Sequence, residues 1–179
     1  MVRLARFLVV LSLATLAGCA TSTSSGAAVS PAQPGQAPDF ALSSLEGKTV
    51  RLSDYVGKVV VLDFWATWCT PCLAEIPHLQ ALYEAHEQEG LVILGLSIDG
   101  PETLSNVAPM VRRYALTFPI LLDDETRVLA QYNPARDAPF AVIIDREGKV
   151  VERRTGYQPG DEKSLEARLV ELLGGARSP

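Results

Sequence analysis

The sequence predicts a single α/β domain in which a mixed β-sheet is flanked by helices. Two runs, at 59–65 and 91–98, have the near-continuous hydrophobicity of strands that are covered on both faces. A helical segment separates them, which favours a right-handed βαβ unit with parallel strands. A further pair of segments, at 140–144 and 149–154, is joined by the tight-turn sequence Asp-Arg-Glu-Gly, so an antiparallel pair completes the mixed sheet.

The remaining elements follow from turn and periodicity signals. A glycine-containing turn separates two short strand segments near the start of the domain, and Pro109 is expected to kink or restart a helix in the middle of the chain. The last helix is expected to begin with Asp161 as its N-cap and to end at Gly174. The expected segments are a hairpin at 39–58, a helix at 70–88, a helical insert at 102–115, a strand at 118–122, a helix at 125–132 and a final helix at 161–174.

Composition places the chain among globular proteins. Its 179 residues are enough for one domain with a sizeable core, since 47% are hydrophobic and 21% are charged. The formal net charge of −5 becomes −7 if residues 1–18 are removed, because that segment holds two of the 16 basic residues and no acidic one. An acidic chain without a cluster of lysine or arginine is not expected to bind nucleic acid.

The N-terminus has the parts of a secretory signal. Arg3 and Arg6 precede an apolar run, and small residues follow that run. The run is far shorter than the ~20 residues that a membrane-spanning helix needs. Leu-Ala-Gly-Cys at 16–19 resembles the lipobox of bacterial lipoproteins, which implies cleavage before Cys19 and acylation of its thiol. The alternative is an ordinary signal peptide with a chance cysteine.

The segment after this signal is expected to be a tether. Residues 19–38 carry no charge and almost no bulky apolar side chain, so they cannot bury enough surface to fold. We predict a signal peptide at 1–18, a lipid-anchored flexible linker at 19–38 and the folded domain at 39–179. Ala20 rather than aspartate follows the cysteine, which by the same resemblance implies the outer membrane of a Gram-negative cell.

The cysteines are the most informative residues of the chain. There are three, and if Cys19 carries lipid, Cys69 and Cys72 remain for chemistry. They lie at the start of the helix that follows the 59–65 strand. Free backbone N–H groups and the helix dipole favour a thiolate there, and a spacing of three residues is within disulfide reach. We predict that an exposed Cys69 attacks and that a shielded Cys72 resolves the mixed disulfide.

Two carboxylates are candidates for tuning this pair. Asp63 is the only charged residue at 59–65, and a buried carboxylate is costly unless it has a partner or a role. Asp63 is therefore predicted to exchange a proton with Cys72 and to have a raised pKa; the alternative is a carboxylate satisfied by backbone donors or turned to solvent. Glu75 lies three residues after Cys72 on nearly the same helix face, where it either tunes the thiols or is simply solvated.

The residues around the cysteines are candidates for contact with a substrate. Trp65 and Trp68 flank the turn, and either is compatible with a position in the core. Because Trp68 directly precedes Cys69, we predict that it forms an exposed docking surface together with Thr70 and Pro71. Proline suits an early helix position, where its missing N–H has no intrahelical partner to lose.

The sequence Phe-Trp-Ala-Thr-Trp-Cys-Thr-Pro-Cys at 64–72 closely resembles the active site of proteins with the thioredoxin fold. Ala-Pro-Asp-Phe at 37–40 and Glu-x-Pro at 75–77 look like the TlpA/ResA branch of membrane-tethered, extracytoplasmic thiol-disulfide oxidoreductases. The resemblance covers residues 37 to about 173, and the central insert of the family matches the segment near 100–120. It implies a thioredoxin fold with an N-terminal hairpin and a central helical insert.

Residue roles follow from this resemblance by position. Cys69 matches the nucleophile, Cys72 the resolving thiol and Glu75 the active-site glutamate of the family. Asp63 falls where thioredoxin has a buried aspartate, although many members of this branch carry asparagine there. Ala138 and Pro139 match the cis-proline loop that faces the disulfide and aligns an incoming peptide.

The chain departs from the family pattern at the proline loop. Phe140 and Ala141 follow Pro139, where threonines are usual. Residues 132–138 also lack the usual Val-x-Gly approach to the proline. The resemblance therefore implies that substrate docking differs here.

The expected function is an extracytoplasmic, membrane-tethered enzyme that reduces disulfides in exported proteins, with apocytochrome c as a family-typical target. The redox pair Cys69–Cys72 is expected to work without a cofactor and without a metal. The expected partners are exported proteins with thiols or disulfides, a membrane electron donor and the membrane itself through the lipid anchor. The protein is expected to be a monomer.

Two alternatives from other classes are weighed against this function. A peroxiredoxin-like peroxidase needs a Pro-x-x-x-Thr/Ser-x-x-Cys pattern, but here Leu62 stands at the position of the proline and Ala66 at that of the threonine or serine. A non-catalytic copper carrier of the SCO type uses Cys-x-x-x-Cys with a distant histidine, and no histidine follows His86. The direction of electron flow stays open, because related Cys-x-x-Cys pairs span from about −270 to −120 mV.

Overall fold

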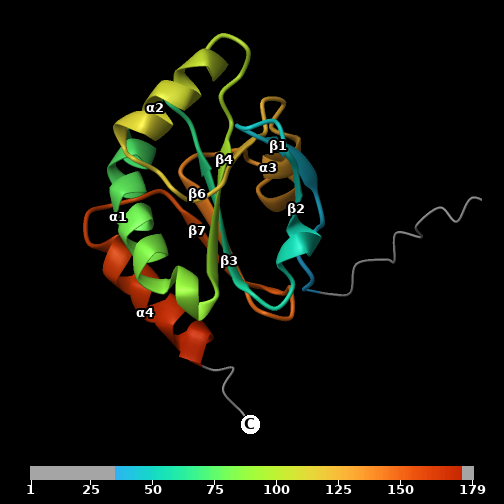
Figure 1. The fold of residues 1–179 in the computed structure, drawn as a ribbon, viewed down its shortest axis with the longest axis vertical. Helices are drawn as coiled ribbons and strands as arrows, with labels where there is room; N and C mark the ends of the chain where they lie inside the picture. Colours follow the sequence, from blue (N-terminus) through green and yellow to red (C-terminus); the bar gives the residue numbers. More distant parts are fainter. Residues whose placement is uncertain (1–34, 175–179) are drawn as a thin grey trace, which may run out of the picture. The chain divides into compact units, whose positions relative to one another are not determined.

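The computed structural model describes residues 35–174, which form a sheet with helices on both faces (Figure 1). Within these residues the sheet has seven strands in the order β2-β1-β5-β4-β3-β6-β7. The strands are β1 (Ala41–Ser44), β2 (Thr49–Arg51), β3 (Val59–Trp65), β4 (Leu91–Ser97), β5 (Ile120–Leu122), β6 (Phe140–Ile144) and β7 (Val150–Thr155). The α-helices are α1 (Thr70–His86), α2 (Val107–Arg113), α3 (Arg127–Tyr132) and α4 (Asp161–Gly174). The predicted thioredoxin-like α/β architecture is confirmed.

The central βαβ unit is the best-predicted part of the fold. Strand β3 spans the expected 59–65 and all seven of its residues are buried. It pairs in parallel with β4, and β4 pairs in parallel with β5. Helix α1 connects β3 to β4 and continues through Pro77 to His86. Burial on both faces explains why the sequence of β3 is an apolar run that only Asp63 interrupts.

Antiparallel strands complete the sheet on both sides. Strand β6 pairs with β3 and β7 pairs with β6, as the tight turn between them predicted. At the other edge, the hairpin of β1 and β2 joins the sheet through β1 and β5. The mixed sheet therefore has a parallel centre and antiparallel edges.

The helical insert is shorter than predicted. A 3₁₀ turn at Leu104–Asn106 precedes α2, so the α-helix begins at Val107 and Pro109 lies in its first turn. Proline is tolerated in a first turn because the N–H groups there have no intrahelical partner. The segment ends at Ala115, whose φ of 50° is left-handed. The helix predicted at 125–132 likewise begins later, at Arg127.

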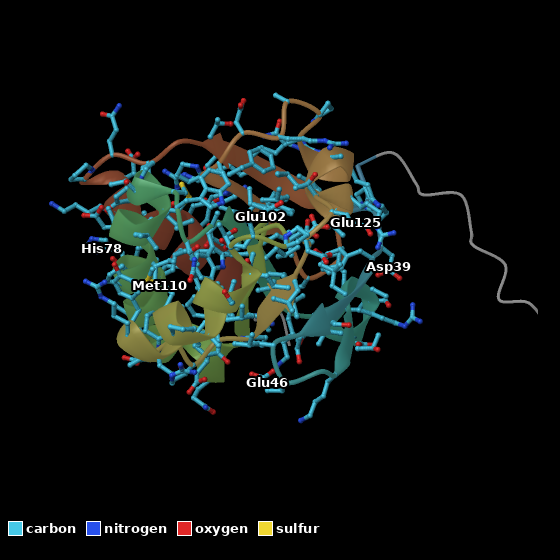
Figure 2. All side chains as sticks on the ribbon, turned by 90° about the horizontal axis from the view of Figure 1, so that it is seen from above. Asp39, Glu46, His78, Glu102, Met110 and Glu125 are labelled. Atoms are coloured by element: carbon cyan, nitrogen blue, oxygen red, sulfur yellow. A yellow bond between two sulfur atoms is a disulfide. The ribbon has the colours of Figure 1, made fainter. Side chains whose placement is uncertain are left out.

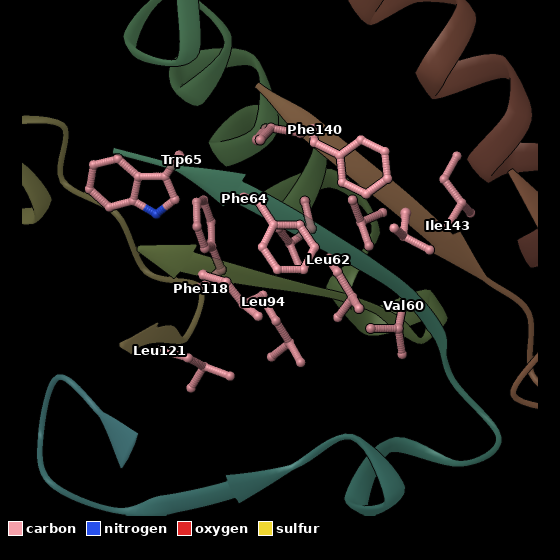
Figure 3. Close-up of a cluster of buried hydrophobic side chains, with 14 of the residues drawn as sticks. Val60, Leu62, Phe64, Trp65, Leu94, Phe118, Leu121, Phe140 and Ile143 are labelled. Atoms are coloured by element: carbon pink, nitrogen blue, oxygen red, sulfur yellow. The ribbon is translucent and has the colours of Figure 1, made fainter. Parts of the chain in front are cut away.

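The alternation of side chains along β3 decides which residues meet which helix. Phe64 packs against Tyr132 of α3 and against Phe140, with ring centroids 6.1 and 5.9 Å apart. Val60 and Leu62 lie on this same face, within the apolar cluster of Figure 3. Because successive strand residues point to opposite faces, Asp63 points to the other face, which α1 and α4 cover. Figure 2 shows the two sides from above, with His78 and Met110 on one and Asp39 and Glu125 on the other.

The boundary between linker and domain stays a prediction, as do the signal peptide at 1–18 and the lipid on Cys19, which lie outside the described residues. Within the described part, Gln36 forms a β-bridge with Lys149, and the Ala37 N–H donates to the Gly148 carbonyl at 2.9 Å. The backbone is thus fixed to the turn between β6 and β7 from about three residues before Asp39. No helix between residues 35 and 174 is long and apolar enough to cross a membrane.

We expect Gly95→Ala to destabilise the sheet by about 1–3 kcal/mol, the usual cost of overpacking a core. A β-carbon on Gly95 would lie 2.9 Å from Ile120 Cδ1 and from Phe118 Cε2, closer than packed atoms approach. Denaturant unfolding of the oxidised protein measures the effect. Gly100→Ala is the control, because its β-carbon meets only the flexible end of Glu102 at 3.4 Å. Equal stabilities for the two variants would contradict the packing argument.

Candidate active site

The two cysteines form a disulfide at the N-terminus of α1. Cys69 and Cys72 are joined by an S–S bond of 2.01 Å, with their Cα atoms 5.3 Å apart. Cys69 is the N-cap residue of α1, and its Sγ accepts a hydrogen bond of 3.3 Å from the Cys72 N–H. Pro71 occupies an early helix position. Once the disulfide opens, the same N–H and the helix dipole stabilise a thiolate on Cys69.

The predicted exposure of Cys69 is wrong for this oxidised state. Cys69 is 5% exposed and Cys72 is 2% exposed, so both are buried. The N-cap position explains this, because it turns the sulfur of Cys69 inward over the first turn of the helix. Cys69 is the less buried of the two cysteines. A thiolate that attacks its sulfur must pass the residues that flank it in the sequence.

Those neighbours form an exposed rim around the disulfide. Trp68 is 60% exposed, one of the few large apolar side chains in the described part that solvent reaches. Thr70 and Pro71 are exposed as well, while Trp65 is completely buried in the core. The structure thus places Trp68 on the surface beside Cys69, as predicted, and its docking role stays a prediction.

A buried aspartate that the sequence analysis did not identify holds the turn before Cys69. Asp99 is fully buried directly after β4, and its carboxylate accepts hydrogen bonds from the Thr67 N–H (2.9 Å) and the Thr67 hydroxyl (2.6 Å). The Ser97 hydroxyl donates a third, at 2.9 Å. The turn itself is closed by the Cys69 N–H, which donates to the Ala66 carbonyl at 3.1 Å. Asp99 therefore fixes the segment that delivers Cys69 to the helix.

Asp63 lies beneath the helix that carries the cysteines. It is 2% exposed and is flanked in the sheet by Gly95 and Ala141. Burial raises the pKa of Asp63 well above its usual value, and the nearby Glu75 carboxylate raises it further. This shift favours the protonated form of Asp63, and the predicted direction of its pKa shift is the one that the structure gives.

Glu75 lies one helical turn after Cys72 and is half-buried. Burial raises the pKa of Glu75 to about 7; the Arg154 guanidinium opposes this rise and the Asp161 carboxylate adds to it. Since Glu75 also acts on Asp63, the two carboxylates form one coupled pair beside Cys72. The raised pKa of Asp63 favours its protonated form, which can give a proton, and Glu75, with a pKa of about 7, can take one near neutral pH.

The loop that contains Ala138 and Pro139 lies at the same end of β3 as the turn to Cys69. The Ala138–Pro139 peptide bond is cis, and Pro139 is buried while Ala138 is half-buried. Phe140 pairs with Phe64, so Pro139 lies at the end of β3 from which the turn to Cys69 departs. The Pro139 carbonyl accepts a hydrogen bond of 2.8 Å from the Gly156 N–H, which attaches the loop to the end of β7. The substrate-aligning role of Ala138 and Pro139 stays a prediction.

Metal ligands do not gather at this site. Between residues 35 and 174 no three His, Cys, Asp or Glu side chains lie in a position to hold a metal ion together. The reactive groups described at this site are the disulfide and the two carboxylates, and the exposed rim lies around the disulfide. Such a set suits exchange of a dithiol for a disulfide with proton transfer to and from the buried thiol.

Comparison with known proteins agrees with this chemistry. The sequence model of the AhpC/TSA family matches residues 35–153. Thiol-disulfide oxidoreductase ResA of Geobacillus thermodenitrificans is 43% identical over 120 residues, which cover 67% of each chain. ResA of a Bacillus cereus strain is 38% identical over 137 residues, which cover 76% of each chain.

Solved structures give the same result. A crystal structure from Chlorobium tepidum, assigned as the thiol:disulfide interchange protein DsbE, superposes with a TM-score of 0.71 at 30% identity and covers 78% of this chain and 96% of that one. A solution structure from Bacteroides thetaiotaomicron, assigned as a protein disulfide isomerase, gives a TM-score of 0.70 at 34% identity, with 78% and 88% covered.

The fold and the Cys-x-x-Cys site thus define a thioredoxin-superfamily protein. The chain belongs to the AhpC/TSA family, and its relatives within that family are thiol-disulfide oxidoreductases of the ResA type. It is an enzyme of thiol-disulfide exchange, as the sequence predicted.

We expect Asp99→Asn to slow the attack of Cys69 several-fold at pH 7. Asp99 accepts three hydrogen bonds on two charged oxygens, whereas asparagine offers one neutral acceptor oxygen and an NH2 group, so the anchor of the turn is weakened. Stopped-flow alkylation of the reduced protein measures the rate of attack. The free energy of unfolding should also fall by about 1–3 kcal/mol, because hydrogen bonds to a buried carboxylate are replaced by weaker ones to a neutral amide.

Asp123→Asn is the matched control for Asp99→Asn. Asp123 is also buried, and its carboxylate accepts the N–H groups of Val128 and Leu129 at the start of α3, away from the cysteines. The Asp123→Asn variant should lose stability, while the rate of attack by Cys69 stays at the wild-type value. The same loss of rate in both variants would mean that Asp99 has no particular role in positioning Cys69.

We expect the oxidised protein to lose stability as pH rises from about 4.5 to about 7, and Glu75→Gln to lose less. Burial raises the pKa of Glu75 from 4.5 to about 7, so the folded protein holds a proton that the unfolded chain has released. This stabilising effect is complete below pH 4.5 and is lost as pH passes through the folded pKa. Denaturant unfolding across this range measures it, with exposed Glu166→Gln as the control. Identical pH dependence in wild type and Glu75→Gln would refute the assignment.

Proposed function

We propose that this protein is an extracytoplasmic, membrane-tethered reductase of disulfides in exported proteins. The observation that carries the proposal is the Cys69–Cys72 disulfide at the N-terminus of α1, with coupled carboxylates beside the resolving cysteine. A helix N-terminus favours the thiolate of Cys69, which is the form that attacks a substrate disulfide. The ResA name of its relatives supports thiol-disulfide exchange as the reaction.

The proposed cycle begins with the reduced enzyme. The Cys69 thiolate attacks one sulfur of a substrate disulfide, forming a mixed disulfide and releasing the first substrate sulfur as a thiolate, which takes a proton from water. Cys72 then loses its proton, and its thiolate attacks the Cys69 sulfur. The second substrate sulfur leaves as a thiolate, and the enzyme ends with the Cys69–Cys72 disulfide seen here. Two electrons have passed from the enzyme dithiol to the substrate disulfide.

The carboxylate pair supports the second step. Cys72 is buried, so its proton needs an acceptor within the protein rather than in bulk water. Glu75 is one turn away, and burial raises its pKa to about 7, close to the pH at which it must work. Asp63, whose raised pKa favours its protonated form, serves the reverse step by returning a proton when Cys72 is released as a leaving thiolate.

Substrate docking is assigned to the rim around Cys69. Trp68, Thr70 and Pro71 offer an exposed surface beside a nucleophile that is itself recessed. Ala138 and Pro139 lie at the same edge of the sheet, where an extended peptide can align with the loop. A recessed nucleophile favours a flexible cysteine-bearing segment over a rigid folded surface.

The cellular setting of the proposal rests on the N-terminus. A lipid on Cys19 would tether the domain outside the cytoplasm, with the segment up to residue 38 as a linker and the outer membrane as a candidate location. The substrates are then exported proteins with disulfides, including apocytochrome c, and the electrons come from the dithiol of a membrane donor that reduces Cys69–Cys72. We propose that the enzyme works as a monomer and without nucleic acid.

Trapping tests the proposed roles. Cys72→Ser should accumulate mixed disulfides between Cys69 and its substrates, because the resolving thiol is missing. Non-reducing electrophoresis and mass spectrometry of extracts from the producing cell measure them. Cys69→Ser is the matched control and should capture little, since Cys72 is the more buried of the two and lies inside the helix rather than at its N-cap.

The outcome also fixes the direction of the reaction. A measured reduction potential near about −270 mV supports a reductase, whereas one near about −120 mV would identify an oxidant. Equal capture of the same partners by both cysteine variants would overturn the assignment of Cys69 as the nucleophile. Recovery of cytoplasmic proteins alone from intact cells would overturn the extracytoplasmic setting.

A further inference from the structure

Arg154 lies in one row with Asp63 across three adjacent strands. Asp63 of β3 pairs with Ala141 of β6, and Ala141 pairs with Arg154 of β7. Directly paired residues point to the same face of a sheet, so the side chains of all three face α1 and α4. Two strand spacings separate Asp63 from Arg154 by about 10 Å between their backbones. Ala141 is small, so it leaves the space above it to the long arginine.

The guanidinium of Arg154 is held in place from α4 and from its own strand. Its Nη2 donates to the Asp161 carbonyl at 3.4 Å and also to the Ser164 hydroxyl. Its Nη1 lies 3.8 Å from Glu152 Oε1, but it is buried without a hydrogen-bond partner among the described residues. A buried guanidinium N–H with no partner is costly, and Arg154 lines the same cavity as Glu75.

Glu75 is surrounded mostly by groups that would disfavour its charge. The titratable groups that face it come from β3, α1, β7, the following loop and α4, and they are Asp63, His78, Arg154, Tyr157, Asp161 and Glu162. Tyr157 donates to Glu162 Oε2 at 3.1 Å, so these two groups are already paired. Arg154 is the member of this set with a permanent positive charge.

We propose that Arg154 is a positioning residue for the thiol-disulfide reaction, which keeps Glu75 ionised so that Glu75 can accept the proton of Cys72. The inference rests on the proposed function, because it assumes that Glu75 takes this proton before Cys72 attacks the mixed disulfide. The transferred species is a proton only, which moves from the Cys72 thiol to the Glu75 carboxylate while the Arg154 charge stays fixed. Arg154 touches neither cysteine nor substrate, and its effect passes through Glu75.

Direct titration of Glu75 tests the proposal independently of catalysis. The carboxyl resonance of Glu75 is followed by carbon NMR in the oxidised protein and identified by its absence in Glu75→Gln. Arg154→Met should move the titration midpoint upward by about one pH unit, since it removes a nearby positive charge. Arg154→Lys, which keeps the charge, should leave the midpoint close to the wild-type value.

Arg153→Met is the matched control. Arg153 is the adjacent residue of the same strand, but it pairs with Val142 and points to the opposite face. The variant removes the same charge from the whole protein without removing it from the Glu75 cavity, so the midpoint should not move. Arg154→Gln keeps a polar side chain at the site, and it replaces Arg154→Met if the latter does not fold.

The pH profile of resolution gives the kinetic readout. Mixing the reduced protein with an aromatic disulfide releases one chromophoric thiolate when Cys69 attacks and a second when Cys72 resolves. The second phase should slow roughly fivefold at pH 7 in Arg154→Met, because fewer Glu75 side chains are ionised, and it should recover at higher pH. The first phase should not change.

The outcomes distinguish a failure of the role of Arg154 from a failure of the proposed function. A midpoint that stays in place in both Arg154→Met and Arg154→Gln overturns the role of Arg154. An equal shift in Arg153→Met would overturn it too, because the effect would then be one of net charge. If Glu75→Gln resolves the mixed disulfide at the wild-type rate, the proton acceptor of the proposed function is wrong, and that result is visible without any Arg154 variant.

Discussion

The junction between β3 and α1 is the constraint on which the site depends. A fully buried strand ends at Trp65, a single turn follows, and Cys69 is already the N-cap of the helix. This short connection puts the sulfur over free backbone N–H groups, which a longer loop would not do. The turn can be short because Asp99 satisfies the Thr67 N–H from below. The chemistry of the cysteine thus depends on hydrogen bonds made before the helix begins.

The second constraint is the placement of charge in the interior. The alternation along β3 turns Asp63 away from the aromatic cluster around Phe64 and towards α1, where Glu75 lies. Two carboxylates in one buried site cannot both be ionised at low cost, and the pKa values of both are raised, which favours a proton on the pair. This proton is available beside a buried thiol that must gain or lose one in each cycle. The same raised pKa values make the folded protein less stable as pH rises, because the unfolded chain releases the proton more easily than the folded protein does.

The exposed and buried parts of the site divide the work between them. Trp68, Thr70 and Pro71 present a surface, whereas both cysteines are recessed and Pro139 is buried beside the end of β3. A recessed disulfide is protected from indiscriminate exchange with any thiol in solution, because access to the sulfur controls its rate. Selectivity then lies with segments that can reach past the rim. The residues on both sides of Pro139, at 132–138 and 140–141, are where this chain departs from the pattern of the TlpA/ResA branch.

The sequence by itself determined the central βαβ unit, the mixed sheet, the redox pair and the two carboxylates, because each depends on local spacing or on an unbroken apolar run. It also indicated Trp68 as exposed, whereas the cis bond at Ala138–Pro139 was implied by the family resemblance. Only the tertiary structure decided that Cys69 is recessed, that Asp99 anchors its turn and that Arg154 shares a row with Asp63. Asp99 lies thirty residues after Cys69, and Arg154 lies eighty-five residues after it. Strand register alone brings both residues to the site. Sequence spacing carries no information on that register, which is why these residues could not be predicted.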